Sequence, residues 1–356
     1  MRLKFYILFL LACCSASAQT TIRTYLPRPR TYYVEPDTVE MVFIGDVMMH
    51  ARQLEYDYTD FLEPLRPLLS QADIAVANME FTLAGKPYSG YPAFSAPDGY
   101  ATYVKDLGVD VFLTANNHIT DKGENGLRRT LQIYDSLRVR HTGTGLEERT
   151  FHRDNPLMLY CKGLRIALVN FTYGTNTQTS YEWPSVSLMD KDEVSRQVSR
   201  ARELGADIVI AVPHWGTEYS LRHSREQELW AQWLEEKGVD AIIGAHPHVV
   251  QDTTSIGAVP VIYSMGNAVS NMSAENTRLE LAVTLKIAVD RHRRARVLTP
   301  ELTFLWCTLP GKLTDGYQTI PVKKYLGHRE MWISPSDYDN MVTTYRRVRT
   351  VTGIQD

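Results

Sequence analysis

Short, uninterrupted apolar runs alternate with helical patterns along most of the chain. The helical patterns, with apolar residues spaced about 3.6 apart, cover residues 124–137, 190–204 and 224–237. Brief continuous apolar runs are typical of strands buried on both faces, so this alternation predicts an α/β fold with largely parallel pairing. The apolar runs occupy residues 41–45, 74–77, 111–115, 208–213, 241–245 and 259–266.

Polar residues bracket these runs in a repeated way. A small residue and an aspartate precede four of them, at Asp73, Asp110, Asp207 and Asp240. Because the carboxyl ends of parallel strands meet at one edge, the polar residues that follow are expected to converge there. For any one of these residues, a simple turn is the competing interpretation. The residues that end the six runs are Asp46, Glu80, Asn117, His214, His246 with His248, and Asn267.

The strand-end residues form a plausible metal-ligand set. Carboxylate, amide and imidazole groups together suit Zn, Mn or Fe rather than an all-thiolate site. The candidates exceed what one tetrahedral ion needs, so we expect two divalent metal ions (Mn, Fe or Zn) that share a carboxylate and clamp a displacement at phosphorus. His118, next to Asn117, is the candidate catalytic acid for a leaving oxygen. The metal candidates are Asp46, Glu80, Asn117, His214, His246 and His248.

Six motifs carry a resemblance to a known family. They are GDVMMH, ANMEF, TANNHITDKG, VPHWGTEY, GAHPHVVQ and YSMGN, in this order along the chain. The order of ligand residues resembles the calcineurin-like metallophosphoesterase pattern. The motifs are similar to the CapA family of bacterial poly-γ-glutamate capsule proteins, over about residues 40–270. The resemblance implies a four-layer αββα sandwich, within a domain expected over residues 39–310, and a place outside the cytoplasm. It also implies that the ligand residues above, and His118 as the acid, take the family's roles.

Two residues depart from the metallophosphoesterase pattern. Met48 stands where the pattern has a histidine, and Glu80 replaces an aspartate. One metal site is therefore expected to be weak, empty or differently ligated. His50 is a candidate replacement for the missing imidazole, and a histidine that merely starts a helix is the simpler interpretation. Residues inside the motifs that are expected to support the ligands or contact substrate are Asp121, Glu218, Gln251 and Asn267.

Three aromatic residues near the motifs have a less specific interpretation. Trp215 and Tyr219 could stack on a substrate, but packing in the core is the simpler expectation. His141 is expected to be structural.

The first 38 residues have the features of an exported chain. Residues 1–18 combine a basic start, an apolar stretch too short to span a bilayer and a small-residue cleavage site, which predicts a signal peptide. An equally supported alternative is a lipoprotein signal with Cys13 as the lipidated residue. Residues 19–38, with three prolines, are expected to form a linker, and residues 311–356 an extension packed on the same domain. Cys161 and Cys307 are expected to be unpaired buried thiols, with one disulfide as the alternative.

Composition narrows the class of function. With a formal net charge of −3 and no nucleic-acid-binding motif, the chain is not expected to bind nucleic acid. The expected partners are an acidic envelope polymer or a phosphoester substrate, together with membrane-bound capsule synthesis components. The first hypothesis is an exported, metal-dependent hydrolase of capsule or poly-γ-glutamate biosynthesis. The alternative is a non-catalytic polymer-binding or scaffold protein of the envelope, a hypothesis that the Met48 departure favours.

Overall fold

The computed structural model describes residues 38–177, 179–290 and 294–356. They belong to Pro36–Asp356, one of the two units into which the chain divides. The predicted signal 1–18, with Cys13, and the predicted linker up to residue 37 lie outside the described residues. Within the described part, no helix combines the length and the apolarity that a bilayer crossing requires.

Two large sheets and one small ribbon contain all the strands of the described residues. The order in the first sheet is β16-β15-β13-β1-β2-β3-β4, with β14 pairing to β13, and the order in the second is β11-β12-β10-β9-β7-β6. The first comprises β1 (Val39–Val47), β2 (Ile74–Met79), β3 (Val111–Leu113), β4 (Arg140–Thr142), β13 (Leu279–Val289), β14 (Ala295–Val297), β15 (Glu301–Thr308) and β16 (Gln318–Pro321). The second comprises β6 (Leu157–Cys161), β7 (Leu164–Thr172), β9 (Ile208–His214), β10 (Ala241–Ile243), β11 (Thr253–Ile256) and β12 (Val259–Ile262). β5 (Thr144–Gly145) pairs with β8 (Ser185–Val186) in the ribbon.

Helices α1 to α6 lie between strands in the sequence, and α7 and α8 follow the last strand. They are α1 (Arg66–Gln71), α2 (Asp98–Asp106), α3 (Gly123–Leu137), α4 (Glu148–Asp154), α5 (Lys191–Glu203), α6 (Arg225–Glu236), α7 (Val322–Tyr325) and α8 (Pro335–Thr352). Short 3-10 helices are η1 (Ala51–Glu55), η2 (Tyr58–Asp60), η3 (Glu63–Leu65) and η4 (Arg329–Met331). The helical patterns of the sequence thus correspond to α3, α5 and α6.

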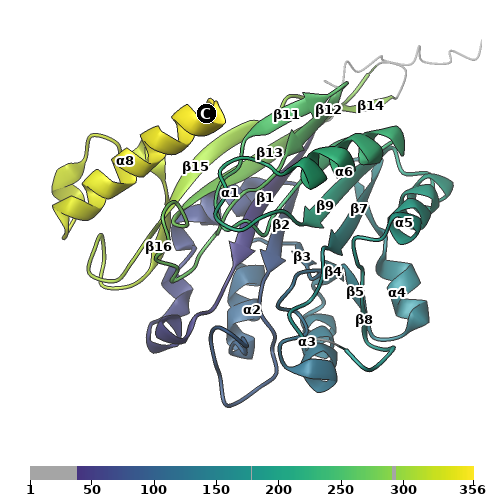
Figure 1. Cartoon of the computed structure of the whole chain (residues 1–356), viewed down its shortest axis with the longest axis horizontal. Coiled ribbons are helices and arrows are strands. Elements are labelled where there is room, and N and C mark those ends of the chain that lie inside the picture. The colour runs from purple at the N-terminus through teal and green to yellow at the C-terminus, as the bar shows by residue number, and fades with distance from the viewer. Residues whose placement is uncertain (1–37, 178, 291–293) are drawn as a thin grey trace, which may run out of the picture. The chain divides into compact units, whose positions relative to one another are not determined.

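Three apolar clusters show how the layers stack, and they confirm the four-layer αββα arrangement. One cluster joins the facing sides of the two sheets, with Met41 and Phe43 of β1 and Ile210 of β9 among its members. A second packs the opposite side of the first sheet against α1, α2 and α3. A third packs the opposite side of the second sheet against α5 and α6, which Figure 1 shows on the right. Burial of each large apolar side chain stabilises the fold by roughly 1.5–3 kcal/mol.

Both sheets contain a block of parallel strands, as the sequence predicts, with antiparallel strands on one side of the block in the first sheet and on both sides in the second. Strands β1 to β4 pair in parallel, and so do β7, β9, β10 and β12. Strands β13, β15 and β16 continue the first sheet in antiparallel pairs, while β6 and β11 close the second. The first sheet is the wider one, and α8 covers part of its inner side. Met341, Tyr345 and Val348 of α8 join the cluster between the sheets.

The aspartates that recur before the strands have a shared structural role. Each carboxylate accepts a hydrogen bond from a backbone N–H at the start of the neighbouring parallel strand, at 2.7–2.8 Å. Each aspartate also donates its own N–H to a carbonyl of that strand at 2.8–2.9 Å. Both bonds together set the register between adjacent parallel strands. The pairs are Asp73 with Glu40, Asp110 with Ala75, Asp207 with Arg165, and Asp240 with Val209.

The two cysteines of the folded part are free thiols. Cys307 is buried, as expected, whereas Cys161 at the end of β6 is partly exposed. The expectation that both are buried is therefore wrong for Cys161, because it lies on an outer strand of its sheet.

Candidate metal centre

The structure brings all six candidate ligands together where the two sheets meet. Asp46 lies in β1, and Glu80 and Asn117 follow β2 and β3 of the first sheet. His214 ends β9, while His246 and His248 follow β10 of the second sheet. All six are buried. The sequence therefore predicts their convergence, but not their division between two sheets.

Asp46 is held by partners from both sheets. Its Oδ1 accepts a hydrogen bond from Asn78 Nδ2 at 2.7 Å, and its Oδ2 lies 3.3 Å from His248 Nδ1. Burial would raise the pKa of Asp46, but the hydrogen bond to His248 and the histidine charges prevail and lower it to about 2. Burial likewise opposes a charged His248, yet Asp46 raises the pKa of that ring above its usual range. Asp46 and His248 therefore form a buried charged pair.

Glu80 is the unsatisfied group at the centre of this arrangement. Both of its oxygens are buried and accept no hydrogen bond, and Oε1 lies 3.9 Å from Nε2 of His214 and from Nε2 of His248. Burial, with the nearby charge of Asp46, raises the pKa of Glu80 well above its usual range. A buried carboxyl without a partner is costly. A cation between Glu80, Asp46 and His248 would remove that cost, and ligand atoms of these three lie within 4.8 Å of one another.

The other two histidines, His214 and His246, differ in their hydrogen bonding. Nδ1 of His246 is buried without a partner, and burial lowers the pKa of His246 to about 3. Burial also lowers the pKa of His214 well below its usual range, while His214 Nε2 lies 2.8 Å from Asn117 Oδ1. Neutral imidazoles are the form that binds metal ions. His246, His248 and the exposed Glu218 form a second group whose ligand atoms lie within 4.8 Å of one another.

The backbone at the two later histidines is strained. His246 has φ 99° and His248 has φ 58°, in the left-handed region that side chains rarely adopt. Such strain persists where surrounding contacts hold it, and it is concentrated at functional sites. The His246 ring lies near those of His214 and His248, and the His248 ring faces Asp46 and Glu80 of the first sheet.

His118 lies at the edge of the ligand cluster. Its Nδ1 is 2.8 Å from Asp121 Oδ2, and the same carboxylate oxygen accepts a hydrogen bond from the N–H of Phe94. Phe94 also packs its ring edge-on against the imidazole, with centroids 4.7 Å apart. Asp121 therefore orients the His118 ring through Nδ1, while Nε2 lies 3.3 Å from Asn176 Nδ2.

Asn267 and Gln251 support ligands or loops. Asn267 Oδ1 lies 2.8 Å from His248 Nδ1, and its Nδ2 donates to the carbonyl of Thr277. The Gln251 side chain accepts a hydrogen bond from Gln227 and donates to the carbonyls of Ser220 and Arg222.

His50 and Met48 lie beside the ligand groups rather than among them. His50 precedes the 3-10 helix η1, and its Nδ1 accepts a hydrogen bond from the N–H of Asn271. Burial lowers the pKa of His50 to about 4. The Met48 side chain packs in the apolar cluster that joins the first sheet to its helices.

Sequence reasoning missed several contacts. Asn78, two residues before Glu80, binds Asp46 and lies 3.3 Å from His214 Nδ1. Asn176, from the segment after β7, lies 3.3 Å from both ring nitrogens of His118. Glu280 of β13 accepts the N–H of Gly45 at 2.7 Å. The sequence offered a signal for Asn78, since this amide ends a predicted strand. It offered none for the contacts of Asn176 and Glu280, because the apolar pattern does not show where their segments lie relative to the site.

Three exposed tyrosines surround the centre. Tyr91 lies 6.3 Å from His118, Tyr173 4.5 Å from His246, and Tyr219 6.4 Å from His248, measured between ring centroids. The simple expectation of core packing holds for Trp215, which is fully buried, and is wrong for Tyr219, which is 45% exposed. Tyr219 also has a left-handed backbone, with φ 64°.

Comparison with known proteins agrees with these motifs. A family model described as bacterial capsule synthesis protein PGA_cap matches residues 40–272. The capsule biosynthesis protein CapA of Bacillus anthracis is 29% identical over 259 residues, which cover 68% of this chain and 62% of that protein. The PGA biosynthesis protein CapA of Bacillus subtilis is 25% identical over 331 residues, with 81% of this chain and 84% of that protein covered. The chain thus spans less than two thirds of the Bacillus anthracis relative.

Solved structures support the fold. A putative 5'-nucleotidase from Staphylococcus aureus superposes with a TM-score of 0.52 at 14% identity, over 75% of this chain and 54% of that one. The calcineurin-like phosphoesterase YfkN from Bacillus subtilis gives 0.50 at 14% identity, over 89% and 98%. The resemblance drawn from the six motifs is confirmed, and with a match over well more than half of its length the chain belongs to the PGA_cap family of bacterial capsule synthesis proteins.

Proposed function

We propose that this protein is a metal-dependent hydrolase of the cell envelope that acts in the synthesis or export of poly-γ-glutamate or a similar acidic polymer. Membership of the capsule synthesis family supports the polymer context. A buried set of carboxylate, amide and imidazole groups at the meeting edge of two sheets supports the chemistry.

The observation that carries the proposal is Glu80. A fully buried carboxyl with neither oxygen hydrogen-bonded, facing the Nε2 atoms of two histidines, is expensive unless it has another partner. The unpartnered Nδ1 of buried His246 adds a second orphaned ligand atom. The residues therefore fit a divalent-ion centre.

Two groups of residues would hold the ions. Asp46, Glu80 and His248 are one group, and Glu218, His246 and His248 are the other. His214 and Asn117 lie between them. When bound, a pair of divalent ions would supply Lewis-acid stabilisation of developing charge and activate a water molecule for attack.

The chain's own residues would do the remaining work. His118, oriented by Asp121, donates a proton to the leaving oxygen through Nε2. The exposed rings of Tyr91, Tyr173 and Tyr219 border the centre and would position the substrate. Phosphoesters are one substrate class for this geometry, and linkages of the acidic polymer are the other.

We also propose that the protein works outside the cytoplasm. The support is the order of basic, apolar and small residues within residues 1–18. Cys13 supplies a site for lipid attachment if the signal is of the lipoprotein kind.

A non-catalytic polymer-binding protein is the second candidate, because Met48 replaces a histidine of the wider pattern and packs in an apolar cluster. The His118–Asp121 pair favours the hydrolase, since a binding-only site has no use for an oriented acid beside its ligands.

Metal content is the direct test. Elemental mass spectrometry on purified residues 19–356, after reconstitution with Mn, Fe or Zn, should give two ions per chain. The double variant His246→Ala and His248→Ala should lose at least one ion while its circular dichroism spectrum is unchanged. His152→Ala, which removes an exposed histidine of α4, is the matched control and should keep the wild-type content.

Hydrolysis is measured on the same samples. A metal-dependent rate on phosphodiesters or on poly-γ-glutamate, abolished by chelation, would support the hydrolase. Wild-type protein that binds no metal after reconstitution would overturn it in favour of the polymer-binding protein.

A further inference from the structure

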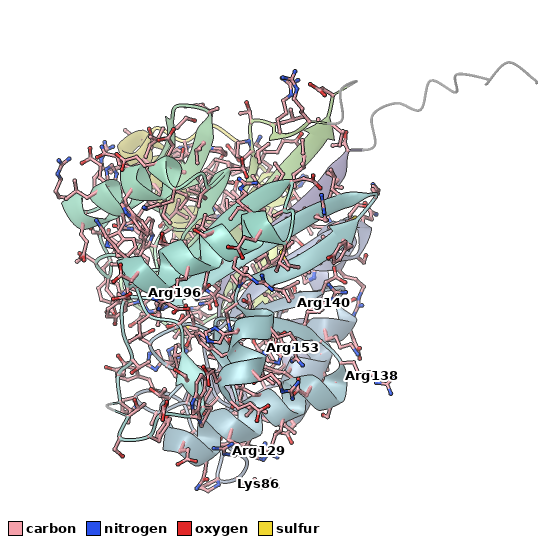
Figure 2. All side chains as sticks on the ribbon, turned by 90° about the vertical axis from the view of Figure 1, so that its right-hand side faces the viewer. Lys86, Arg129, Arg138, Arg140, Arg153 and Arg196 are labelled. Atoms are coloured by element: carbon pink, nitrogen blue, oxygen red, sulfur yellow. The ribbon has the colours of Figure 1, made fainter. Side chains whose placement is uncertain are left out.

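A hollow lined by arginines lies away from the metal centre. It has a volume of about 230 Å³, and the end of α3, β4, α4 and the start of β6 border it. Arg138, Arg140 and Arg153 line it, and Figure 2 shows these three near one another on one face of the molecule. His141, Asp135 and Asp154 complete its charged and titratable lining.

The cations in this hollow outnumber the acids available to them. Arg153 is paired with Asp154, through two hydrogen bonds. Asp135 Oδ1 lies 3.3 Å from His141 Nε2. Among the described residues, neither Arg138 nor Arg140 forms an ion pair with any acid. The hollow therefore carries excess positive charge.

Arg138 holds its position at a conformational cost. It caps the C-terminus of α3 with φ 55°, in the left-handed conformation that glycine adopts most easily at this position. Lys122, at the other end of the same helix, shows no such strain, with φ −110°. The backbone N–H of Arg138 caps α3, and Arg140 donates a hydrogen bond to the carbonyl of Met158 at 3.3 Å, but neither guanidinium has a carboxylate partner among the described ion pairs.

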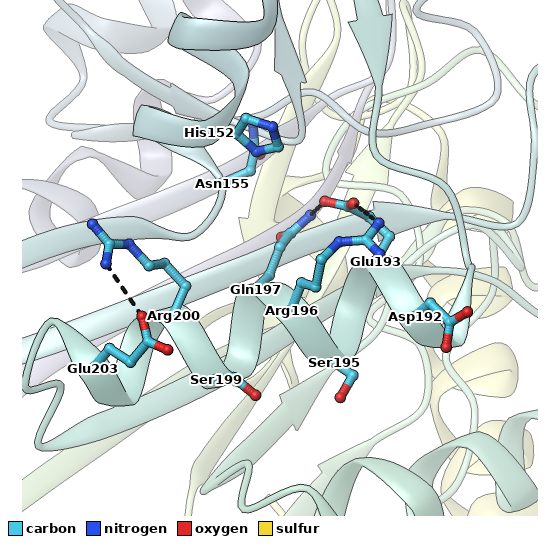
Figure 3. Close-up of a pocket in the computed structure, with 10 residues that line it drawn as sticks. All are labelled: His152, Asn155, Asp192, Glu193, Ser195, Arg196, Gln197, Ser199, Arg200 and Glu203. Carbon is cyan, nitrogen blue, oxygen red and sulfur yellow. Dashed lines mark hydrogen bonds and ion pairs between the residues drawn. The ribbon is translucent and has the colours of Figure 1, made fainter.

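A larger hollow on the same face provides the contrast. It has a volume of about 600 Å³ between α4 and α5, with Arg196 and Arg200 in its lining (Figure 3). Each arginine there has a carboxylate partner: Arg196 with Glu193, and Arg200 with Glu203. The larger hollow is thus internally neutralised, whereas the smaller one is not.

We propose that the hollow lined by Arg138, Arg140 and Arg153 binds an anionic group, carboxylate or phosphate, of an extended acidic polymer. This inference rests on the proposed function only for the identity of the polymer. Guanidinium groups bind both kinds of anion through paired N–H donors. A volume of about 230 Å³ accommodates one such group and its flanking atoms.

Its position in the sheet makes the hollow a second binding site rather than a part of the metal centre. Arg140 begins β4, opposite Val111 at the start of β3, whereas Asn117 follows the end of β3. At about 3.3 Å per residue the two ends of β3 are roughly 7 Å apart, and four further residues lead from its end to Asn117, so the hollow and the metal centre lie toward opposite ends of this strand. A polymer held here would leave the metal centre free to act on another part of the same chain.

The test compares two variants that each lose two charges. Arg138→Gly with Arg140→Ala removes the unpaired cations, and glycine relieves the strain at 138, so misfolding is not expected. Arg196→Ala with Arg200→Ala is the matched control on the same face. Binding of fluorescent poly-γ-glutamate, and of polyphosphate of matched charge, is measured by anisotropy at low salt.

We expect the first variant to bind about tenfold more weakly than wild type and the control to change less than about twofold, since paired cations contribute little. The difference should fade at about 0.5 M salt because of screening. Preference for one of the two polymers would identify the natural anion. Equal losses in both variants, or no binding of either polymer by the wild type, would overturn the inference.

Metal content and hydrolysis of a small phosphodiester separate this inference from the proposed function. Both should be unchanged in the two variants, because none of the substituted residues touches the metal centre. If wild type lacks hydrolysis but binds polymer through Arg138 and Arg140, the proposed function fails and this inference stands.

Discussion

At the scale of single residues, His118 and Asp121 decide whether the centre is catalytic. His118→Ala removes the proton donor but no candidate ligand, so metal content should stay at the wild-type value. The rate should fall by about 10²–10⁴-fold, the usual contribution of a general acid. The rate is measured by stopped-flow or steady-state assays, and the metal content by elemental analysis. An unchanged rate would exclude His118 as the acid.

Asp121→Asn tests the orienting contact, which lies at 2.8 Å. We expect a smaller loss of rate than in His118→Ala, together with a shifted basic limb of the pH–rate profile, since a general acid must be protonated to act. A loss of rate with an unaltered profile would mean that Asp121 only supports the fold.

Glu280 is a buried acid whose protonation should be visible in stability. Burial raises its pKa well above the usual range, while Oε1 accepts the Gly45 N–H. In the unfolded chain the group ionises above about pH 4.3, so the native state binds more protons and its stability from this group falls as pH rises. Glu280→Gln keeps the acceptor and cannot ionise.

The variant should therefore gain stability relative to wild type between pH 5 and 8, by up to about 1.4 kcal/mol per pH unit below the folded pKa. Urea unfolding with chelator present measures the difference in unfolding free energy between the variant and wild type. A gap that is constant with pH would mean that Glu280 is ionised in the folded protein.

The sequence predicts the six ligand candidates because each ends a recognisable strand. It does not reveal Asn176, which approaches His118 from a segment after β7 in the other sheet. Such a contact depends on how two sheets face each other, and apolar periodicity within one strand carries no information about that. Met48 and Tyr219 show the same limit, since burial and exposure there follow from neighbours distant in sequence.

At the scale of secondary-structure elements, the aspartates that precede parallel strands fix register. Asp207→Ala would leave the N–H of Arg165 without its acceptor and should destabilise the fold by about 1 kcal/mol, a modest value because the site is partly exposed. Asp207→Asn keeps an acceptor oxygen and should cost less. Chemical denaturation of both variants tests the order, and equal losses would point to charge rather than to register.

The parallel strands and the main helices could be predicted because each combines an apolar pattern with clear boundary residues. Alternating apolar residues over 279–289 predict a strand that corresponds to β13, but the pattern does not show that β13 to β16 continue the first sheet in antiparallel pairs. They alternate in the ordinary way, and the partner of an alternating strand is chosen by long-range packing. The four-layer arrangement came from the family resemblance rather than from periodicity.

At the scale of the whole molecule, a buried ion pair fastens the C-terminal helix. Arg278 forms two hydrogen bonds of 2.7 Å with Asp337 of α8 and a third, of 2.8 Å, with the carbonyl of Cys307. Asp337→Ala would leave the buried guanidinium of Arg278 without its carboxylate partner and should destabilise the protein by about 3 kcal/mol.

Asp339→Ala, which breaks the exposed pair between Asp339 of α8 and Arg329 of η4, is the control and should cost much less stability than Asp337→Ala. Thermal unfolding of the two variants makes the comparison. A loss in Asp337→Ala no larger than in the control would show that α8 is held by its apolar residues alone.

The division of the candidate ligands between two sheets has a consequence for the order of assembly. Asp46, Glu80 and Asn117 come from the first third of the chain, whereas His214, His246 and His248 are made much later. A centre that needs both sets cannot capture an ion tightly until the later sheet has docked. If these residues hold ions as proposed, metal loading would be a late step of maturation that follows the joining of both halves.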